Sequence, residues 1–77
     1  GVGFREAATV FADDDALLIS DPDHSDDEER FVLIGIGSAA RVLVVVHCLR
    51  DDGDEIRLIS ARRANKSEQS AYFRRKL

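Results

Sequence analysis

The apolar residues of this chain follow two different spacings, which predict one short helix and then a series of strands. Near the start, four apolar residues recur at the three- and four-residue intervals of one helical face. They are Phe4, Ala7, Ala8 and Phe11. This spacing predicts a helix over residues 4–12, which three aspartates at 13–15 then end, because aspartate is unfavourable at a helix C-terminus.

Four later segments are rich in branched apolar residues and predict β-strands. They span residues 16–20, 30–36, 41–50 and 54–60. The links between the last three segments are too short for a parallel crossover, so these strands should form an antiparallel meander. Residues 42–46 are apolar without alternation, which indicates a central strand covered on both faces.

Beyond the last strand the chain becomes basic and helical. Asn65 and Glu68 have the spacing of a capping box, so a helix is predicted from there towards Leu77. This order predicts an α+β fold with an N-terminal helix, a four-stranded, mainly antiparallel β-sheet and a C-terminal helix. The 77 residues suffice for one domain, residues 1–77, whose small core we expect a partner subunit to stabilise.

Charge divides the chain into two parts, although the net charge of the whole is only −4. Residues 1–29 carry a net charge of −9, and residues 30–77 carry a net charge of +5. This asymmetry suggests two surfaces with different partners, one of which could be an RNA. The acidic part argues against a general nucleic-acid binder.

The acidic segment at residues 21–29 begins like a calcium-binding loop. Asp26 stands where such a loop needs glycine, and Val32 stands where it needs glutamate, so an EF-hand is excluded. A looser divalent-metal site remains open, formed by Asp21, Asp23 and His24. A solvated loop or a surface for a basic partner explains the segment better, so neither a metal nor another cofactor is expected.

Several classes of protein can be set aside. No apolar run approaches the roughly 18–20 residues that span a bilayer, and the sequence has no glycine-rich phosphate loop, CxxC pair or nucleophile elbow. Cys48 is the only cysteine and lies in the most apolar strand, which favours a buried thiol and a reducing, cytoplasmic location. Because the chain starts at Gly1 and contains no methionine, we expect it to be a fragment.

The turn lengths predict which residues face one another across the sheet. A three-residue loop at 51–53, with its glycine in the left-handed conformation, would pair His47 with Arg57. A four-residue loop at 37–40 would pair Arg30 with His47. Arg30, His47 and Arg57 would then form one cross-strand row on one face. A slip of one residue would send them to opposite faces.

Such a row would suit chemistry on a phosphate backbone. Cleavage of RNA through its own 2′-hydroxyl needs a base, an acid and cations that stabilise charge on the phosphate. Histidine can transfer protons near neutral pH, and arginine can hold phosphate oxygens with two parallel hydrogen bonds. The other interpretation is that His47 is a core histidine with satisfied hydrogen bonds and that the arginines extend from the sheet edges into water.

The last helix combines aromatic and basic residues, because Tyr72 and Phe73 precede Arg74, Arg75 and Lys76. Such a set could stack on RNA bases and bind phosphates. For Tyr72 and Phe73 the favoured interpretation is structural, in which Ala71, Tyr72 and Leu77 dock on the sheet while the cations face water. The role of the basic tail is left open.

At these motifs the sequence resembles the BrnT family of toxins from bacterial type II toxin–antitoxin systems. The matching elements are Gly1-Val2-Gly3-Phe4, Glu6-Ala7-Ala8, Val10-Phe11-Ala12-Asp13, Asp21-Pro22-Asp23-His24-Ser25, Glu29-Arg30-Phe31, Leu43-Val44-Val45-Val46-His47, Arg57-Leu58-Ile59-Ser60-Ala61-Arg62-Arg63-Ala64, Glu68 and Tyr72. They cover nearly the whole chain in order, and the Ile-Ser-Ala-Arg element after a Val-His strand is fairly specific.

The resemblance implies a small RelE-like domain, in which helices pack on a curved antiparallel sheet, and an activity that blocks growth by cutting RNA. It also implies a BrnA antitoxin that neutralises the toxin and carries a DNA-binding domain, so that the complex represses its own promoter. Catalysis would fall on the matching positions Glu29, Arg30, His47, Arg57, Arg62 and Tyr72.

The sequence departs from the family pattern at two places. Family members usually carry a further segment before the Gly-Val-x-Phe element, so we expect this chain to be N-terminally truncated and to lack part of the basic surface. Asp14 stands where the family often has proline, and we expect that change to act locally.

Two hypotheses about function follow. The first is a toxin endoribonuclease that cleaves RNA by metal-independent 2′-hydroxyl attack, with Arg30 and Arg57 binding the phosphate and His47 transferring a proton. A BrnA-like antitoxin would cover its basic sheet face, operator DNA would be reached only through that antitoxin, and a homo- or hetero-oligomer without membrane contact is compatible. The alternative is a non-catalytic protein-interaction module that acts as a corepressor with a DNA-binding antitoxin.

Overall fold

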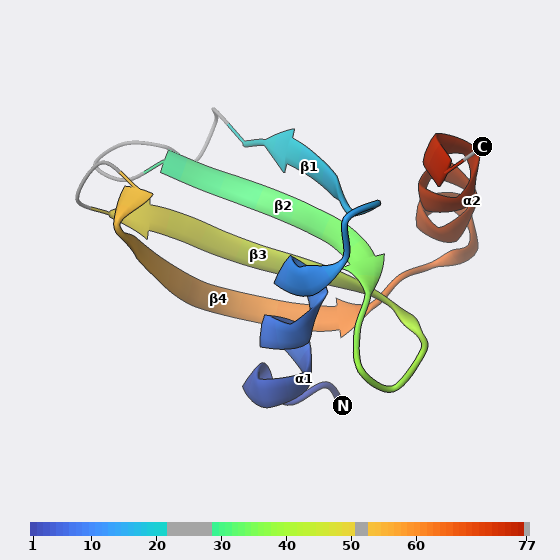
Figure 1. Ribbon diagram of the computed structural model, residues 1–77, viewed down its shortest axis with the longest axis horizontal. Helices are drawn as coiled ribbons and strands as arrows, with labels where there is room; N and C mark the ends of the chain where they lie inside the picture. The colour runs from blue at the N-terminus through green and yellow to red at the C-terminus, as the bar shows by residue number, and fades with distance from the viewer. Residues whose placement is uncertain (22–28, 51–52, 77) are drawn as a thin grey trace.

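The computed structural model describes residues 1–21, 29–50 and 53–76 and places them in an α+β fold (Figure 1). In chain order the elements are α1 (Phe4–Thr9), the 3-10 helix η1 (Val10–Ala12), β1 (Leu17–Ser20), β2 (Glu29–Ile36), β3 (Val42–Arg50), β4 (Glu55–Arg63) and α2 (Lys66–Lys76). The predicted order of helix, four strands and helix is confirmed. The last strand extends three residues further than predicted and ends at Arg63.

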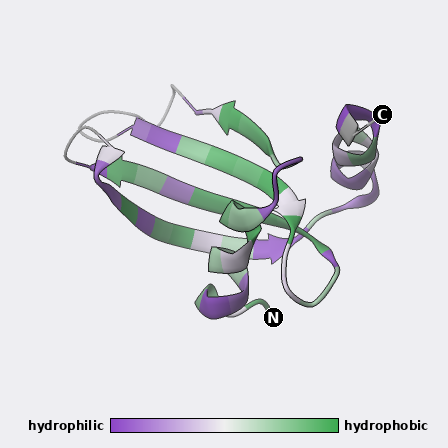
Figure 2. Cartoon of the chain, in the orientation of Figure 1, coloured by the Kyte–Doolittle hydropathy of each residue, from purple (hydrophilic) through white to green (hydrophobic). Residues whose placement is uncertain are grey.

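The four strands form one antiparallel sheet in the order β1-β2-β3-β4, so the chain meanders without a crossover. β1 and β4 are the edge strands. Residues 42–45 of β3 are all buried, which confirms the prediction of a central strand covered on both faces. Figure 2 shows hydrophobic residues concentrated on β2 and β3, whereas α2 is largely hydrophilic.

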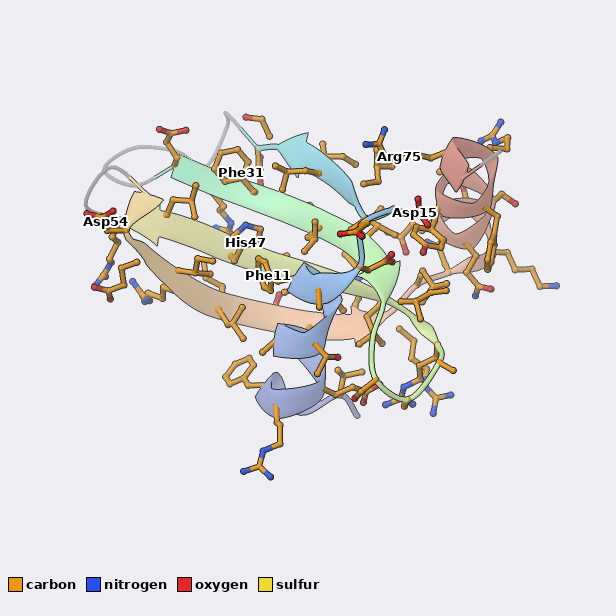
Figure 3. The ribbon with its side chains drawn as sticks, viewed as in Figure 1. Phe11, Asp15, Phe31, His47, Asp54 and Arg75 are labelled. Atoms are coloured by element: carbon orange, nitrogen blue, oxygen red, sulfur yellow. The ribbon has the colours of Figure 1, made fainter. Side chains whose placement is uncertain are left out.

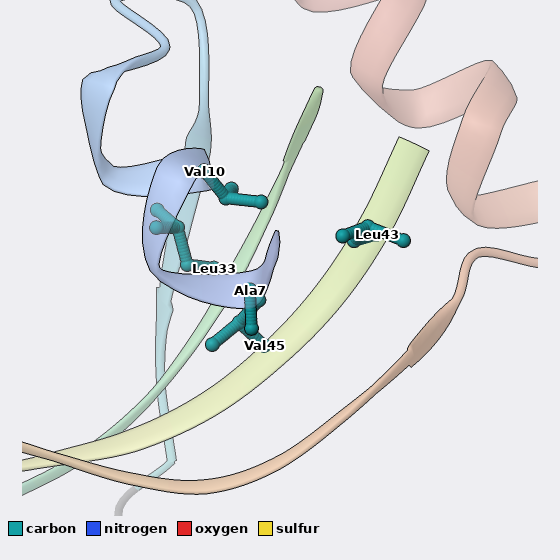
Figure 4. Packing of buried hydrophobic residues seen from close by; sticks show 5 residues of the cluster. All are labelled: Ala7, Val10, Leu33, Leu43 and Val45. Carbon is teal, nitrogen blue, oxygen red and sulfur yellow. The ribbon is translucent and has the colours of Figure 1, made fainter. Parts of the chain in front are cut away.

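One face of the sheet packs against α1 and η1, and we call it the α1 face (Figure 4). Its buried core consists of Ala7, Val10, Leu33, Leu43 and Val45. The predicted helical face is wrong in part, because Val10 points to the sheet in place of the two phenylalanines, Phe4 and Phe11, which are exposed. The helix tightens into a 3-10 segment at Val10, and residues three apart lie on one line when a turn has about three residues.

The opposite face packs against α2, and we call it the α2 face. Its buried core consists of Ile34, Val42, Val44, Ala64 and Tyr72. The helix covers the end of the sheet where β2 ends and β3 begins (Figure 1). Each face is therefore closed by one helix at that end.

The C-terminal helix begins with the capping box that the sequence predicts. The Glu68 N–H donates to Asn65 Oδ1 at 2.8 Å, and the Asn65 N–H donates to Glu68 Oε1 at 2.8 Å. These two bonds satisfy N–H groups that have no partner within the helix.

Asp13 joins the two helical layers at this end of the sheet. Its Oδ2 accepts a hydrogen bond from the Tyr72 hydroxyl at 2.6 Å and another from the Ile36 N–H at 2.8 Å. Its Oδ1 accepts one from the Asp15 N–H at 3.0 Å. The aspartate run thus follows the first helical segment as predicted, and Asp13 also ties η1 to β2 and α2.

The turn between β2 and β3 is one residue longer than predicted. Ile36 pairs with Val42, so the link consists of residues 37–41 instead of 37–40. Ala40 adopts a φ of 61° there, a left-handed conformation that is uncommon for a residue with a side chain. The sequence does not predict this conformation of Ala40, which lies within the five-residue link between β2 and β3.

The turn between β3 and β4 is also one residue longer than predicted. Arg50 pairs with Glu55 instead of Asp54. Gly53 has a φ of 93°, which confirms the left-handed conformation predicted for it. The glycine was placed correctly, but the loop around it has four residues instead of three.

Candidate functional site

The longer turns shift both registers by one residue, and the predicted row of Arg30, His47 and Arg57 is therefore wrong. His47 lies opposite Phe31 on β2 and Leu58 on β4. Because side chains alternate between the two faces along a strand, a shift of one residue changes the face. His47 lies on the α1 face, whereas Arg30 and Arg57 lie on the α2 face.

His47 is buried in the α1 face, with 3% of its surface exposed. Its ring stacks on Phe31 with centroids 5.8 Å apart and meets Phe11 edge-on at 4.9 Å (Figure 3). Burial lowers the pKa of His47, and the Val45 backbone offsets that effect only in part. Its Nδ1 makes no hydrogen bond of standard geometry to a described residue. His47 is thus a neutral core histidine, but without the satisfied hydrogen bonds expected of one.

Arg30 and Arg57 still share a face, with Cys48 between them. Arg30 pairs with Cys48 across β2 and β3, and Cys48 pairs with Arg57 across β3 and β4. Neighbouring strands lie about 4.8 Å apart, so the two arginine backbones are roughly 10 Å apart. Long guanidinium side chains can converge over that distance above Cys48, which is buried as predicted. We call Arg30, Cys48 and Arg57 the arginine row.

A carboxylate lies beside the arginine row. Asp21 follows β1, and its N–H donates to the Arg30 carbonyl at 2.9 Å. Its Oδ2 lies 3.9 Å from Arg30 Nε, and both side chains are half-buried. The row and Asp21 together can bind a phosphate and accept a proton.

Arg62 lies on the same face, further along β4, where it pairs with Val44. Its guanidinium donates to both oxygens of Glu68, at 2.8 and 2.7 Å. These hydrogen bonds raise the pKa of Arg62 and lower the pKa of Glu68. The pair fastens β4 to the first turn of α2, while more than half of the Arg62 side chain stays exposed.

Tyr72 belongs to the core under the α2 face. Burial, together with the nearby Asp13 carboxylate, raises the pKa of Tyr72 to about 12, so the hydroxyl is protonated and donating at neutral pH. The predicted docking of Tyr72 on the sheet is confirmed. Phe73, the next residue, is 47% exposed. Adjacent helical residues point about 100° apart, so only one of the two rings can meet the sheet.

Glu29 begins β2 and pairs with Leu49, which places its exposed side chain on the α1 face. The six predicted site residues therefore separate into three groups. Partly or fully exposed on the α2 face are Arg30, Arg57 and Arg62. Buried under that face is Tyr72, and on the opposite face are Glu29 and His47.

The sequence pattern does not single out Asp21 as a neighbour of Arg30. Only the pairing of β1 with β2 brings the two together. For the exposure of Phe73 the signal exists in the sequence, because two adjacent aromatic residues cannot share one helical face.

Neither a cluster of three metal-ligating side chains nor a membrane-spanning helix is found among the described residues. Within 1–21, 29–50 and 53–76, histidine, cysteine and acidic side chains form no cluster of three that could hold a metal ion. The looser divalent-metal site that the sequence leaves open includes Asp23 and His24, which lie outside these ranges. In the same ranges neither helix combines the length and apolar character needed to cross a membrane.

The chain matches a known protein family over most of its length. Residues 1–68 match the family described as the ribonuclease toxin BrnT of type II toxin–antitoxin systems. A comparison with curated proteins finds no match. The family match includes every strand, the arginine row and the start of α2. The chain therefore belongs to the BrnT family of ribonuclease toxins of type II toxin–antitoxin systems, a class of toxin that has an antitoxin partner.

Proposed function

We propose that this chain is an endoribonuclease that cleaves RNA by metal-independent attack of the 2′-hydroxyl, with the scissile phosphate held over the arginine row. One observation carries the proposal. Arg30 and Arg57 lie on one face, on either side of Cys48, and Asp21 lies beside them. Two guanidinium groups and a carboxylate are then within reach of one phosphate.

The chemistry follows from these three side chains. Arg30 and Arg57 donate hydrogen bonds to the non-bridging oxygens and stabilise the negative charge that the phosphate gains in the transition state. The Asp21 carboxylate accepts the 2′-hydroxyl proton while the 2′-oxygen bonds to phosphorus. The 5′-oxygen leaves with its bonding electron pair and takes a proton from water, which yields a 2′,3′-cyclic phosphate and a 5′-hydroxyl.

His47 has a packing role in this proposal. It lies on the other face of the sheet, beneath Phe11 and Phe31, and cannot reach a phosphate bound on the α2 face. Tyr72 and Arg62 support the site through their bonds to Asp13 and Glu68, which hold α2 in place.

Single substitutions in the full chain test the site. Arg30→Ala and Arg57→Ala should each slow cleavage of single-stranded RNA about 100- to 1,000-fold, the usual loss when one donor to a charged transition state is removed. Asp21→Asn should slow it at least about 100-fold. Arg5→Ala is the matched control, because Arg5 is an exposed arginine on α1. His47→Phe tests the packing role, and both of these variants should cleave RNA like wild type.

The outcomes separate the roles of the two faces. If Arg30→Ala and Arg57→Ala fold and cleave like wild type, the arginine row is not the active site. If folded His47→Phe has lost cleavage, the histidine is catalytic and the proposed site lies on the wrong face. A chelating agent should leave the rate of RNA cleavage unchanged. Loss of cleavage in the presence of the chelator would contradict the metal-independent step.

We also propose that a BrnA-like antitoxin neutralises the chain by covering the α2 face, where its acidic groups would replace the phosphate on the arginine row. Operator DNA would then be bound through the antitoxin. Arg57→Ala should weaken antitoxin binding, whereas Arg5→Ala should not. An antitoxin footprint that leaves Arg30 and Arg57 accessible would contradict this arrangement.

A further inference from the structure

Phe73 is an exposed aromatic ring held in a defined orientation. It follows Tyr72 on α2 and is 47% exposed. Its ring meets the buried Tyr72 ring at 71° with centroids 5.2 Å apart. Because Tyr72 is itself fixed by Asp13, the Phe73 ring has a rigid neighbour on one side and water on the other.

Two shallow hollows meet at Phe73. One runs along α2 and is lined by Phe73 with Lys66, Ser70 and Arg74. The other lies between α2 and the end of β4 and is lined by Phe73 with Arg63, Ala64 and Gln69. Each hollow therefore places basic and polar side chains beside the same ring.

Positive charge is concentrated in this part of the chain. Residues 62–77 carry a net charge of +5, whereas residues 1–61 carry a net charge of −9. Arg41, which also lines the second hollow, is already bound to Glu6, with two hydrogen bonds of 2.8 Å. Arg63 pairs with Leu43 of the α1-face core, and its charge acts on Glu6 as well. The cations that we assign to a ligand are thus Lys66 and Arg74.

We propose that Phe73 is a stacking platform for an unpaired base of the RNA, with Lys66 and Arg74 binding the adjoining phosphates. Stacking on an aromatic ring contributes about 1–3 kcal/mol per base and does not depend on which base is present. The inference rests on the proposed function, because it assigns a second contact to the same substrate. It adds that the RNA is single-stranded where it crosses α2.

The chemistry of the surroundings favours RNA over a protein partner at this site. The core of a protein interface is depleted in charged residues, but here basic, serine and glutamine residues line the hollows beside the ring, together with the apolar Ala40, Val42 and Ala64 of the second hollow. A polyanion with flat bases complements both the charge and the ring.

The platform and the arginine row lie at opposite ends of β4. Arg57 and Ala64, which lines the second hollow, are seven residues apart, and at about 3.3 Å per residue roughly 20 Å separates them. One substrate can occupy both places if several nucleotides run along the strand. We therefore expect a longer single-stranded RNA to bind more tightly than a very short one.

A tryptophan substitution gives a direct probe of stacking. The chain contains no tryptophan, so Phe73→Trp introduces a single fluorophore on the platform. Its fluorescence should be quenched by a single-stranded oligouridine RNA and not by a duplex RNA of the same length. Phe73→Ala should weaken binding of the oligouridine about 5- to 150-fold, the equivalent of one lost stack.

Two further variants make the test specific. Phe73→Leu keeps an apolar side chain but removes the flat ring, so it should lose nearly as much RNA affinity as Phe73→Ala. Ile56→Ala is the matched control, because Ile56 is 50% exposed at the other end of β4. It should bind RNA like wild type.

The platform is wrong if Phe73→Ala and Phe73→Leu bind the RNA like wild type, or if duplex RNA quenches Phe73→Trp equally. It is also wrong if these variants bind RNA normally but lose the antitoxin, since the surface would then be a protein interface. The proposed function is judged separately, by cleavage in Arg57→Ala. If cleavage is lost in Arg57→Ala but unchanged in Phe73→Ala, the platform is contradicted and the proposed function stands. If RNA quenches Phe73→Trp but the wild-type chain cleaves no RNA, the proposed function is contradicted and the platform stands.

Discussion

The two faces of the sheet are built from the same strands but differ in what they present beyond their helices. Beyond α1, the α1 face continues with aromatic and aliphatic side chains around buried His47, and Ile56 at its far end is exposed. Beyond α2, the α2 face continues with Arg30 and Arg57 beside Asp21. Alternate residues of β2, β3 and β4 supply both surfaces.

A domain of this size can combine a core with a binding surface because the two faces of one sheet carry different side chains. The α1 face places a titratable ring under Phe11 and Phe31, where it stays neutral and packs. On the α2 face the arginines lie near water. The side chain between them, the buried Cys48 thiol, is small and adds little bulk to the row. Both faces have a buried core under their helix, but beyond the helices the α1 face continues with packed side chains, and we assign chemistry to the arginines of the α2 face.

The two faces are coupled through Asp13 at the end where both helices lie. Its Oδ2 receives hydrogen bonds from Tyr72 on the α2 side and from Ile36 at the end of β2. Gly35 lies directly before this contact, and a Cβ at Gly35 would lie 3.0 Å from both Val10 Cγ1 and Asp13 Oδ2. Substitutions here test whether the faces are stabilised together.

The largest effect is expected at Tyr72. Tyr72→Ala should lower the free energy of unfolding by about 3–5 kcal/mol, the cost of removing a large buried ring. Tyr72→Phe removes only the hydroxyl and its bond to the Asp13 carboxylate, and should cost about 1.5–3 kcal/mol. Urea unfolding followed by circular dichroism measures both. Phe73→Leu, next to it in sequence but exposed, should change stability by less than about 0.5 kcal/mol.

Alkaline titration sharpens the same point, because Tyr72 is the only tyrosine and its ultraviolet absorbance reports it alone. Its pKa is raised from 10.0 to about 12 in the folded chain, so the unfolded state loses its proton first. The stability due to neutral Tyr72 is complete below pH 10 and is lost as the pH rises towards about 12. Titration of the folded protein near pH 10 would show that the ring is not held as described.

The next largest effect is expected at Gly35, where η1 approaches β2 most closely. A Cβ there would lie 3.0 Å from each of Ala16 Cβ, Asp13 Oδ2 and Val10 Cγ1. Gly35→Ala should therefore cost about 1–3 kcal/mol through overpacking. Gly1→Ala, where no atom lies within 4 Å, is the control.

A double-mutant cycle extends this measurement. Gly35→Ala and Tyr72→Phe both disturb Asp13 but lie on different faces, so their effects on the free energy of unfolding should not add. Simple additivity would mean that the two faces are stabilised independently.

The smallest effect at neutral pH is expected at His47. Phenylalanine keeps the ring between Phe11 and Phe31 and removes a buried nitrogen that lacks a well-formed hydrogen bond, so His47→Phe should change stability at pH 7 by less than about 1.5 kcal/mol. The difference should appear in acid. Burial holds the pKa of His47 below the ordinary histidine value of 6.5, so the unfolded chain binds the proton first.

The sign of this pH dependence can be checked by urea unfolding at several pH values. The contribution of His47 is fully present above pH 6.5 and is lost as the pH falls through the lowered pKa of the folded state. His47→Phe should therefore lose less stability between pH 7 and pH 5 than wild type. An equal loss in both proteins would mean that the imidazole is not desolvated.

Features that depend on local sequence are predicted well. The capping box at Asn65 and Glu68 requires only the side chains and backbone of one helical turn. The central position of residues 42–45 follows from an unbroken apolar run, because a strand covered on both faces has no polar positions. The left-handed Gly53 follows from the freedom of a residue without a Cβ.

The candidate site is predicted only in part, for a reason that can be located. Arg30 and Arg57 do share a face, but the residue between them is Cys48 and not His47. Each turn holds one residue more than its sequence suggests, and in the first turn this involves Ala40 in a conformation that a sequence gives no reason to expect. Because β2 and β4 are both shifted by one residue relative to β3, the two arginines still share a face, whereas His47 lies on the opposite face.

The order of the elements, the central strand, the cap of the last helix and the family could all be read from the sequence, because these depend on short-range spacing and residue type. The face that each side chain occupies could be read only from the folded chain, in which His47 packs on one face while Arg30 and Arg57 share the other, with Asp21 beside Arg30. The physical reason is that strand side chains alternate with a period of two, so one additional turn residue reverses the face of a whole strand.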